Sequence, residues 1–100
     1  MATRITQIED PERDRTILRV EGSLAVEDAE LLERLCKTLE QKSDQRVTID
    51  VTDLHFLDSE AASVLRRLKQ EQNVDLEGVH FFIQKVIEMT ERSASRGTIQ

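Results

Sequence analysis

The stretch that decides the fold is residues 47–69, VTIDVTDLHFLDSEAASVLRRLK. Val47, Ile49 and Val51 alternate with polar residues, which is typical of a β-strand with one buried face. After Asp58-Ser59 the apolar residues recur at helical spacing, so this pair lies where a strand gives way to a helix. The free backbone N–H groups and the dipole of a helix N-terminus favour an anion. The junction therefore predicts a serine hydroxyl at a place suited to carrying a phosphate.

Two strands and a long helix are predicted before this stretch. Residues 4–9 and 16–21 are expected to pair as a hairpin across a turn containing Pro11, and Gly22 is expected to end the second strand. Residues 24–42 carry an apolar face and an acidic beginning, which predicts a helix.

After the strand at residues 47–51, the sequence predicts an apolar loop containing Leu54, Phe56 and Leu57, then a helix over residues 59–72. Residues 74–77 alternate and predict a short strand closed by a glycine.

The segment from residue 80 to about residue 92 is predicted to be a third helix, because Phe82, Val86 and Met89 continue a helical spacing beyond any ordinary strand length. A strand at residues 79–83 is the alternative. Residues 93–100 are small and polar and predict a disordered tail.

The predicted order is β-β-α-β-α-β-α, within a single domain at residues 1–92. A strand–helix alternation that follows a hairpin implies an α/β fold: a mixed four-stranded sheet with helices packed on it.

Composition excludes several classes of function. The chain has a net charge of −6, no Trp or Tyr and no basic block, so nucleic-acid binding is not expected. Cys36, the single cysteine, lies on the apolar face of its helix and is expected in the core. His55, His80 and Cys36 lack the spacing of metal ligands, so no metal or cofactor is expected. Without a signal peptide, a long apolar run or a catalytic constellation, the sequence predicts a cytoplasmic protein that is not an enzyme and does not insert into membranes.

Residues 47–69 resemble the STAS domain, which is named for sulfate transporters and anti-sigma factor antagonists. The signature of that family is a hydrophobic strand, a loop with an Asp, and Asp-Ser-(Ser/Thr)-Gly at the start of a helix. Residues 57–61 read LDSEA here, with Glu60 and Ala61 in place of the usual small polar residue and Gly. Residues 20–24, VEGSL, are similar to the family's Val-x-Gly-Glu-Leu, and the resemblance extends over residues 4–92.

In bacterial anti-sigma factor antagonists of this family, an anti-sigma factor kinase phosphorylates the serine. The unmodified form binds that kinase and releases the sigma factor, and phosphorylation breaks the complex. The resemblance thus implies that Ser59 is the acceptor and that the partner is an anti-sigma factor or a related serine kinase. The residues expected to contact the partner are Ser23, Leu24, Asp58, Ser59, Glu60, Ser63 and Arg66.

Three alternatives remain open from the sequence. In the first, Asp58-Ser59 is a helix N-cap and has no further role. In the second, the chain is a constitutive cytoplasmic subunit that docks on the ATPase of a lipid-transport ABC complex, as some STAS-like domains do. In the third it is a small-ligand sensor. The exposed edge expected at residues 4–9 is compatible with a monomer or a weak homodimer.

Overall fold

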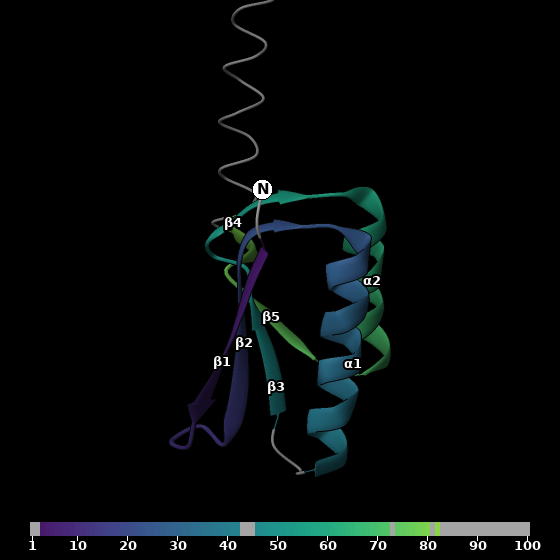
Figure 1. Ribbon diagram of the computed structural model, residues 1–100. Helices are drawn as coiled ribbons and strands as arrows, with labels where there is room; N and C mark the ends of the chain where they lie inside the picture. Colours follow the sequence, from purple (N-terminus) through teal and green to yellow (C-terminus); the bar gives the residue numbers. More distant parts are fainter. Residues whose placement is uncertain (1–2, 43–45, 73, 81, 83–100) are drawn as a thin grey trace, which may run out of the picture.

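The computed structural model describes residues 3–42, 46–72, 74–80 and 82, which form one sheet and two helices (Figure 1). The elements are β1 (Thr3–Asp10), β2 (Arg15–Leu24), α1 (Val26–Lys42), β3 (Arg46–Asp50), β4 (Leu54–Leu57), α2 (Ser59–Glu71) and β5 (Asp75–Glu77). The strands lie in the order β1-β2-β3-β5, and β4 pairs with β2. β1 and β2 are antiparallel and the other pairs are parallel, which confirms the predicted α/β fold, its hairpin and its mixed sheet.

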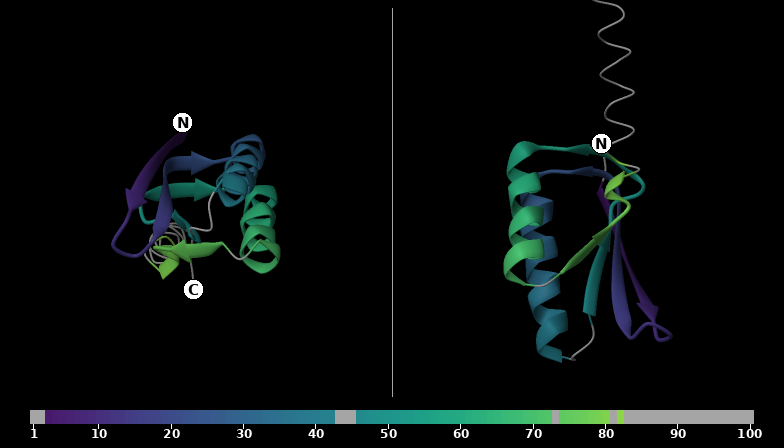
Figure 2. Two further views of the ribbon diagram at one scale, coloured as in Figure 1. Left: turned by 90° about the horizontal axis from the view of Figure 1, so that it is seen from below. Right: turned by 180° about the vertical axis from the view of Figure 1, so that it is seen from behind.

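Both helices cover the same face of the sheet and lie side by side (Figures 1 and 2). The face beneath them is built by alternation along the strands, with Leu18 and Val20 of β2 beside Val47 and Ile49 of β3, all at most 3% exposed. Cys36 of α1 is fully buried among these side chains, as predicted, and burial raises the pKa of its thiol to about 12. The core therefore lies between one face of the sheet and the two helices.

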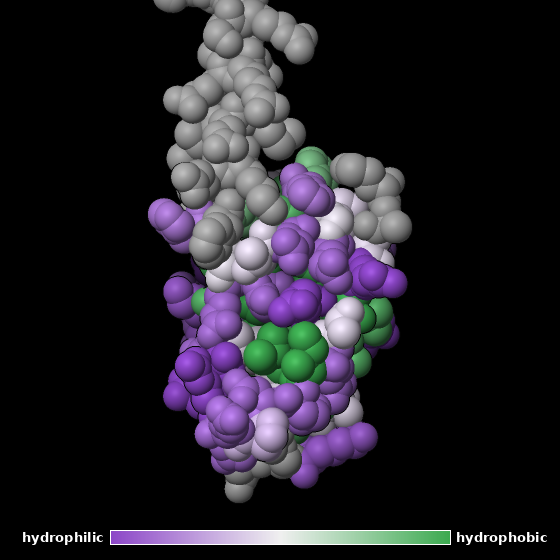
Figure 3. Space-filling view, turned by 90° about the vertical axis from the view of Figure 1, so that its left-hand side faces the viewer, coloured by the Kyte–Doolittle hydropathy of each residue, from purple (hydrophilic) through white to green (hydrophobic). Residues whose placement is uncertain are grey.

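The opposite face of the sheet is held together by ion pairs. Arg15 of β2 contacts Asp10 of β1 at 3.0 Å and Glu77 of β5 at 2.5 Å, and Arg19 lies 3.6 Å from Asp50 of β3. Figure 3, which looks onto the β1 side of the molecule, shows a hydrophobic patch surrounded by hydrophilic residues. This face is thus stabilised by polar contacts between neighbouring strands, whereas the other face is stabilised by burial.

The prediction of four strands is wrong by one, because residues 54–57 form the short strand β4 and not a loop. Gly22 does not end β2, which continues to Leu24. β2 pairs with β3 up to Arg19 and with β4 from Gly22, and the positive φ of 87° at Gly22 accompanies a shift of the β2–β4 register between Gly22 and Ser23. Because β2 runs to Leu24, α1 begins at Val26, two residues later than expected.

The C-terminal prediction is tested only in part. β5 is present, and the helical conformation of Val79, His80 and Phe82 contradicts the alternative of a strand at residues 79–83. The amide of Phe82 donates to the carbonyl of Gly78 at 3.1 Å, which is the first turn of the predicted helix. Its continuation at residues 83–92 and the predicted tail at residues 93–100 lie outside the described residues.

The turn after β5 packs directly on the loop that follows β3. The amide of Val51 donates to the carbonyl of Glu77 at 2.9 Å, while the carboxylate of Asp50 accepts from the amide and the hydroxyl of Thr52 at 2.9 and 2.6 Å. Gly78 has a φ of +78°, and a Cβ there would lie 2.1 Å from the Thr52 hydroxyl and 2.6 Å from its amide nitrogen. Only glycine fits this position.

We therefore expect Gly78→Ala to lower the free energy of unfolding by at least about 2 kcal/mol, since it adds both backbone strain and a steric clash. Urea unfolding followed by circular dichroism measures this change. Asn tolerates positive φ but carries the same Cβ, so Gly78→Asn should be nearly as harmful. Full stability of the Asn variant would show that the contact with Thr52 is unimportant.

Candidate functional site

The candidate site lies at the N-terminal end of α2, where two distant parts of the sequence meet. Parallel pairing places Ser23 beside Phe56 and Leu24 beside Leu57. The amide of Gly22 donates to the carbonyl of Asp53, and the amide of Asp58 donates to that of Leu24, both at 3.3 Å. These bonds bring the end of β2 against the start of α2.

Asp58 is the N-cap of α2. Its backbone is extended, with φ −80° and ψ 164°, and its carboxylate accepts a hydrogen bond of 2.7 Å from the amide of Ala61. The carbonyl of Asp58 accepts the first helical bond, from Ala62 at 2.9 Å. The capping role proposed for the Asp58-Ser59 pair thus belongs to Asp58.

Ser59 is the first residue of α2, and it is exposed. Ser63 and Arg66 are exposed as well, and they follow Ser59 at spacings of four and seven residues, so all three lie on one face of α2. The hydroxyl of Ser63 donates to the carbonyl of Ser59 at 3.1 Å. The structure therefore presents the side chain of Ser59 to the solvent, at the end of a helix face that an approaching protein can reach.

The charges around Ser59 have opposing effects. The helix dipole favours an anion at this end, but the carboxylate of Asp58 already caps it and the exposed Glu60 adds a second negative charge in the first turn. The nearest cation on the same face is that of Arg66, which begins about 10 Å further along the axis by helix geometry. A phosphate on Ser59 would therefore make this end of the molecule strongly negative.

The side of α2 is fixed against α1 by an ion pair with two hydrogen bonds. The guanidinium of Arg67 donates to both oxygens of Glu33, at 3.1 and 2.9 Å. The hydrogen bond from Arg67 lowers the pKa of the Glu33 carboxyl below its usual 4.5. The ion pair therefore contributes fully to the free energy of unfolding above the usual carboxyl pKa of 4.5. This contribution is lost as the pH falls through the lowered pKa of Glu33. None of the ion pairs formed by the described residues involves Arg66, which is exposed.

One of the predicted partner residues does not reach the surface. Leu24 is fully buried in the core, so its side chain cannot contact a partner, although its carbonyl positions Asp58. Ser23 is half-buried, and its carbonyl accepts a hydrogen bond from the hydroxyl of Thr3. The other predicted residues, Asp58, Ser59, Glu60, Ser63 and Arg66, lie together at the start and along one side of α2.

Phe56 is a residue of this surface that sequence reasoning missed. Its side chain is 49% exposed although Leu54, two residues earlier, is fully buried. Strand alternation would place both on the same face, so the pattern gave no reason to separate them. Phe56 pairs with Ser23 just past the shift in the β2–β4 register, so a large exposed aromatic ring lies on the short strand that leads into the start of α2.

Within the described part of the chain, no cluster of three His, Cys, Asp or Glu side chains is arranged to hold a metal ion. None of the helices described there has the length and apolar character needed to cross a bilayer.

Comparison with known proteins identifies related sequences and folds. A sequence model of the STAS domain matches residues 5–99. The crystal structure of an antisigma-factor antagonist, a STAS domain from Rhodobacter sphaeroides, superposes with a TM-score of 0.58 and 22% sequence identity, covering 83% of this chain and 94% of that one. No curated protein sequence matches the chain.

Asp58→Ala is expected to lower the free energy of unfolding by about 0.5–2 kcal/mol, because it removes the acceptor of the Ala61 amide. Asp58→Asn should retain most of the stability, and Ser59→Ala should change it by less than about 0.5 kcal/mol. Chemical unfolding of the three variants measures these values. A larger loss from Ser59→Ala than from Asp58→Ala would mean that Ser59 has the structural role assigned here to Asp58.

Proposed function

This chain belongs to the STAS domain family, and from that membership we propose that it is a protein-binding regulatory module of the anti-sigma factor antagonist type. Its partner in this proposal is an anti-sigma factor or a related serine protein kinase, and Ser59 is the residue phosphorylated. The similarity of its fold to an antisigma-factor antagonist supports the proposal. The observation that carries it is the exposed Ser59 on the first turn of α2, three residues after the exposed Phe56 of β4.

The proposed docking surface consists of Phe56, Ser59, Glu60, Ser63 and Arg66. Phe56 supplies the apolar anchor, since a half-exposed aromatic ring gains most from burial against a partner. Ser59 and Ser63 lie on the adjacent face of α2, and their small side chains allow a partner protein to approach the helix closely. Arg66 and Glu60 lie at the two sides of the serines and influence which charges the partner brings.

Phosphorylation would act on this surface through charge. A phosphoserine carries about −1.5 to −2 charges near neutral pH. Placed between the carboxylates of Asp58 and Glu60, it would have to be desolvated when the partner binds. Each 1.4 kcal/mol of that cost lowers affinity about tenfold. The fold itself should survive the modification, because Ser59 is exposed and makes no capping bond with its side chain.

A second candidate function is favoured by the same two carboxylates. Asp58 and Glu60 disfavour a phosphate between them, which suits a surface used without a switch. The chain would then be a constitutive subunit that docks through Phe56 and α2 on the ATPase of a lipid-transport ABC complex. In that case binding should be insensitive to charge at Ser59.

We expect Ser59→Asp to lower the affinity for the cognate anti-sigma factor kinase at least tenfold, while Ser59→Ala binds like the wild type and is not phosphorylated. Titration calorimetry measures the affinities, and mass spectrometry of the protein incubated with the kinase and ATP locates the phosphate. Ser63→Asp, one turn later, is the matched control for an added charge and should have a smaller effect. Equal binding by wild type and Ser59→Asp, or a phosphate found only elsewhere, would contradict the switch; copurification of both with a transporter ATPase would favour the second candidate.

Phe56→Ala is expected to weaken partner binding at least tenfold with little loss of stability, because the ring is half exposed in the free protein. Leu31→Ala is the matched control, since Leu31 on α1 is a large apolar side chain with a similar exposure of 41%. Binding and thermal unfolding are measured on both variants. Wild-type affinity for Phe56→Ala would exclude this ring as the anchor under either candidate function.

A further inference from the structure

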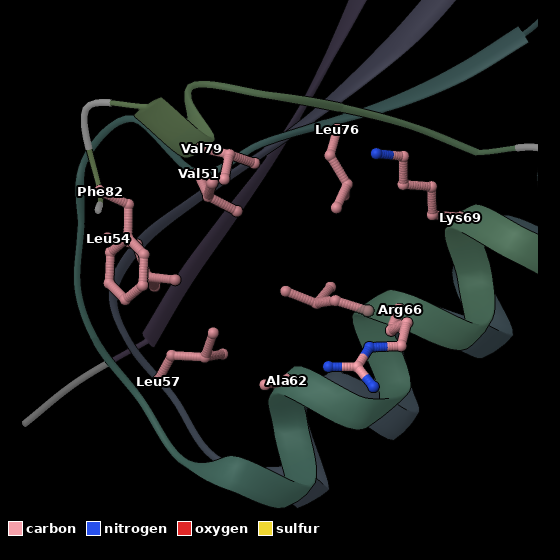
Figure 4. Close-up of a pocket in the computed structure, with 10 residues that line it drawn as sticks. Val51, Leu54, Leu57, Ala62, Arg66, Lys69, Leu76, Val79 and Phe82 are labelled. Atoms are coloured by element: carbon pink, nitrogen blue, oxygen red, sulfur yellow. The ribbon is translucent and has the colours of Figure 1, made fainter. Parts of the chain in front are cut away.

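The two strands that end the sheet, β5 and β1, differ in how well they resist pairing with another chain. β5 has three residues, of which Asp75 and Glu77 are charged, while Leu76 points toward α2 (Figure 4). β1 has eight residues and pairs with β2 without a bulge along its whole length. Short length, charge, Pro and bulges are the usual means by which an edge strand avoids pairing. The middle of β1, residues 5–8, has none of these, and no described element lies beyond it (Figure 1).

An apolar side of α1 lies along the same open edge. The hydroxyl of Thr3 donates to the carboxylate of Asp28 at 3.0 Å, so the side of α1 that carries Asp28 is turned toward β1. Leu31 and Leu35 follow Asp28 by three and seven residues and share that side, whereas α2 contacts α1 at Glu33. Leu31 is 41% exposed and Leu35 is partly buried. A chain added at β1 would therefore also meet apolar side chains of α1.

We propose that β1 pairs antiparallel with β1 of a second copy of this chain, about a two-fold axis beside Gln7, and joins the two five-stranded sheets into one. Such an axis stands perpendicular to the sheet. It therefore keeps the helices of both copies on one face and turns the sides of the two α1 helices that carry Leu31 toward each other. This dimer does not rest on the proposed function or on phosphorylation.

The charges at the two ends of β1 select this register. Pairing about Gln7 sets Arg4 of each copy opposite Asp10 of the other, with both side chains on the sheet face away from the helices. Arg4 is exposed and takes part in none of the ion pairs formed by the described residues. Asp10 contacts Arg15 through one carboxylate oxygen, so its other oxygen can accept from Arg4 of the second copy. Registers centred on Arg4 or Glu9 would instead bring like charges together.

The uncharged middle of β1 fits the same register. Thr6 of each copy lies opposite Ile8 of the other, and β-branched side chains of this kind pack well across neighbouring strands. Ile8 already faces Ile17 of β2 on this side of the sheet, so the contact extends an apolar row. A strand that fits the edge of β1 needs its charges in the reverse order, and β1 read antiparallel supplies that order itself. A second copy is therefore the partner that this edge suits.

Sedimentation equilibrium of the full chain tests the association, and a monomer–dimer equilibrium is expected between about 10 µM and 1 mM. Arg4→Glu should raise the dimer dissociation constant at least about tenfold, because symmetry turns two attractions into two repulsions. Arg13→Glu makes the same change of charge in the exposed turn after β1 and should raise the constant less than about twofold. A chain that stays monomeric at about 1 mM, or equal effects of the two variants, would overturn the proposal.

Cysteine cross-linking locates the axis, since the natural Cys36 is fully buried. Gln7→Cys places two thiols across the two-fold axis, so mild oxidation should link most of the dimer through a disulfide. Arg13→Cys puts the thiol at another exposed position of the same hairpin, far from the axis, and should stay largely unlinked. Gln7 and Arg13 are both exposed, so both variants should fold. Equal linking of the two variants, or a dimer whose Gln7→Cys form does not link, would rule out this pairing.

Discussion

The parallel pairing of the last residues of β2 with β4 is the constraint on which the rest of this site depends. Only three residue pairs form it, yet they carry the chain from the buried sheet to the exposed start of α2. Asp58 closes the junction from both sides, since its amide donates to Leu24 and its carboxylate accepts from Ala61. Ser59 is exposed because these bonds hold the residue before it and leave its own side chain unused. The start of α2 is thus held by hydrogen bonds and is still accessible, which suits a protein-binding surface.

Much of this architecture could be predicted from residue patterns. The alternation at Val47, Ile49 and Val51 predicts a strand, and the helical spacing after Ser59 predicts a helix. Both patterns can be recognised in the sequence because they depend only on which side of the element faces the core. The same reasoning located Cys36 in the interior and Asp58-Ser59 at a helix start. The family resemblance supplied what the patterns could not, namely the chemistry expected of an exposed serine at this position.

The parts that were not predicted depend on how strands pair. Gly22 is a usual place for a strand to end, and nothing in the local sequence indicates that β2 resumes beside a different neighbour. Residues 54–57 do not alternate in burial, so a short strand there could not be separated from a loop. The exposure of Phe56 accompanies the register shift between β2 and β4, whereas Leu24 is buried because β2 continues past Gly22 and keeps the alternation of Leu18 and Val20. Both errors in the site therefore concern the part of β2 beyond Gly22, whose pairing with β4 becomes visible only in three dimensions.

The buried thiol of Cys36 has a practical consequence. With a pKa of about 12 and no exposed surface, it remains protonated and shielded at neutral pH. Maleimide dyes and thiol-reactive spin labels will therefore not react with Cys36 in the folded protein. A cysteine introduced anywhere on the surface becomes the sole reactive group, and the natural chain can serve as the background for distance measurements by fluorescence or electron spin resonance.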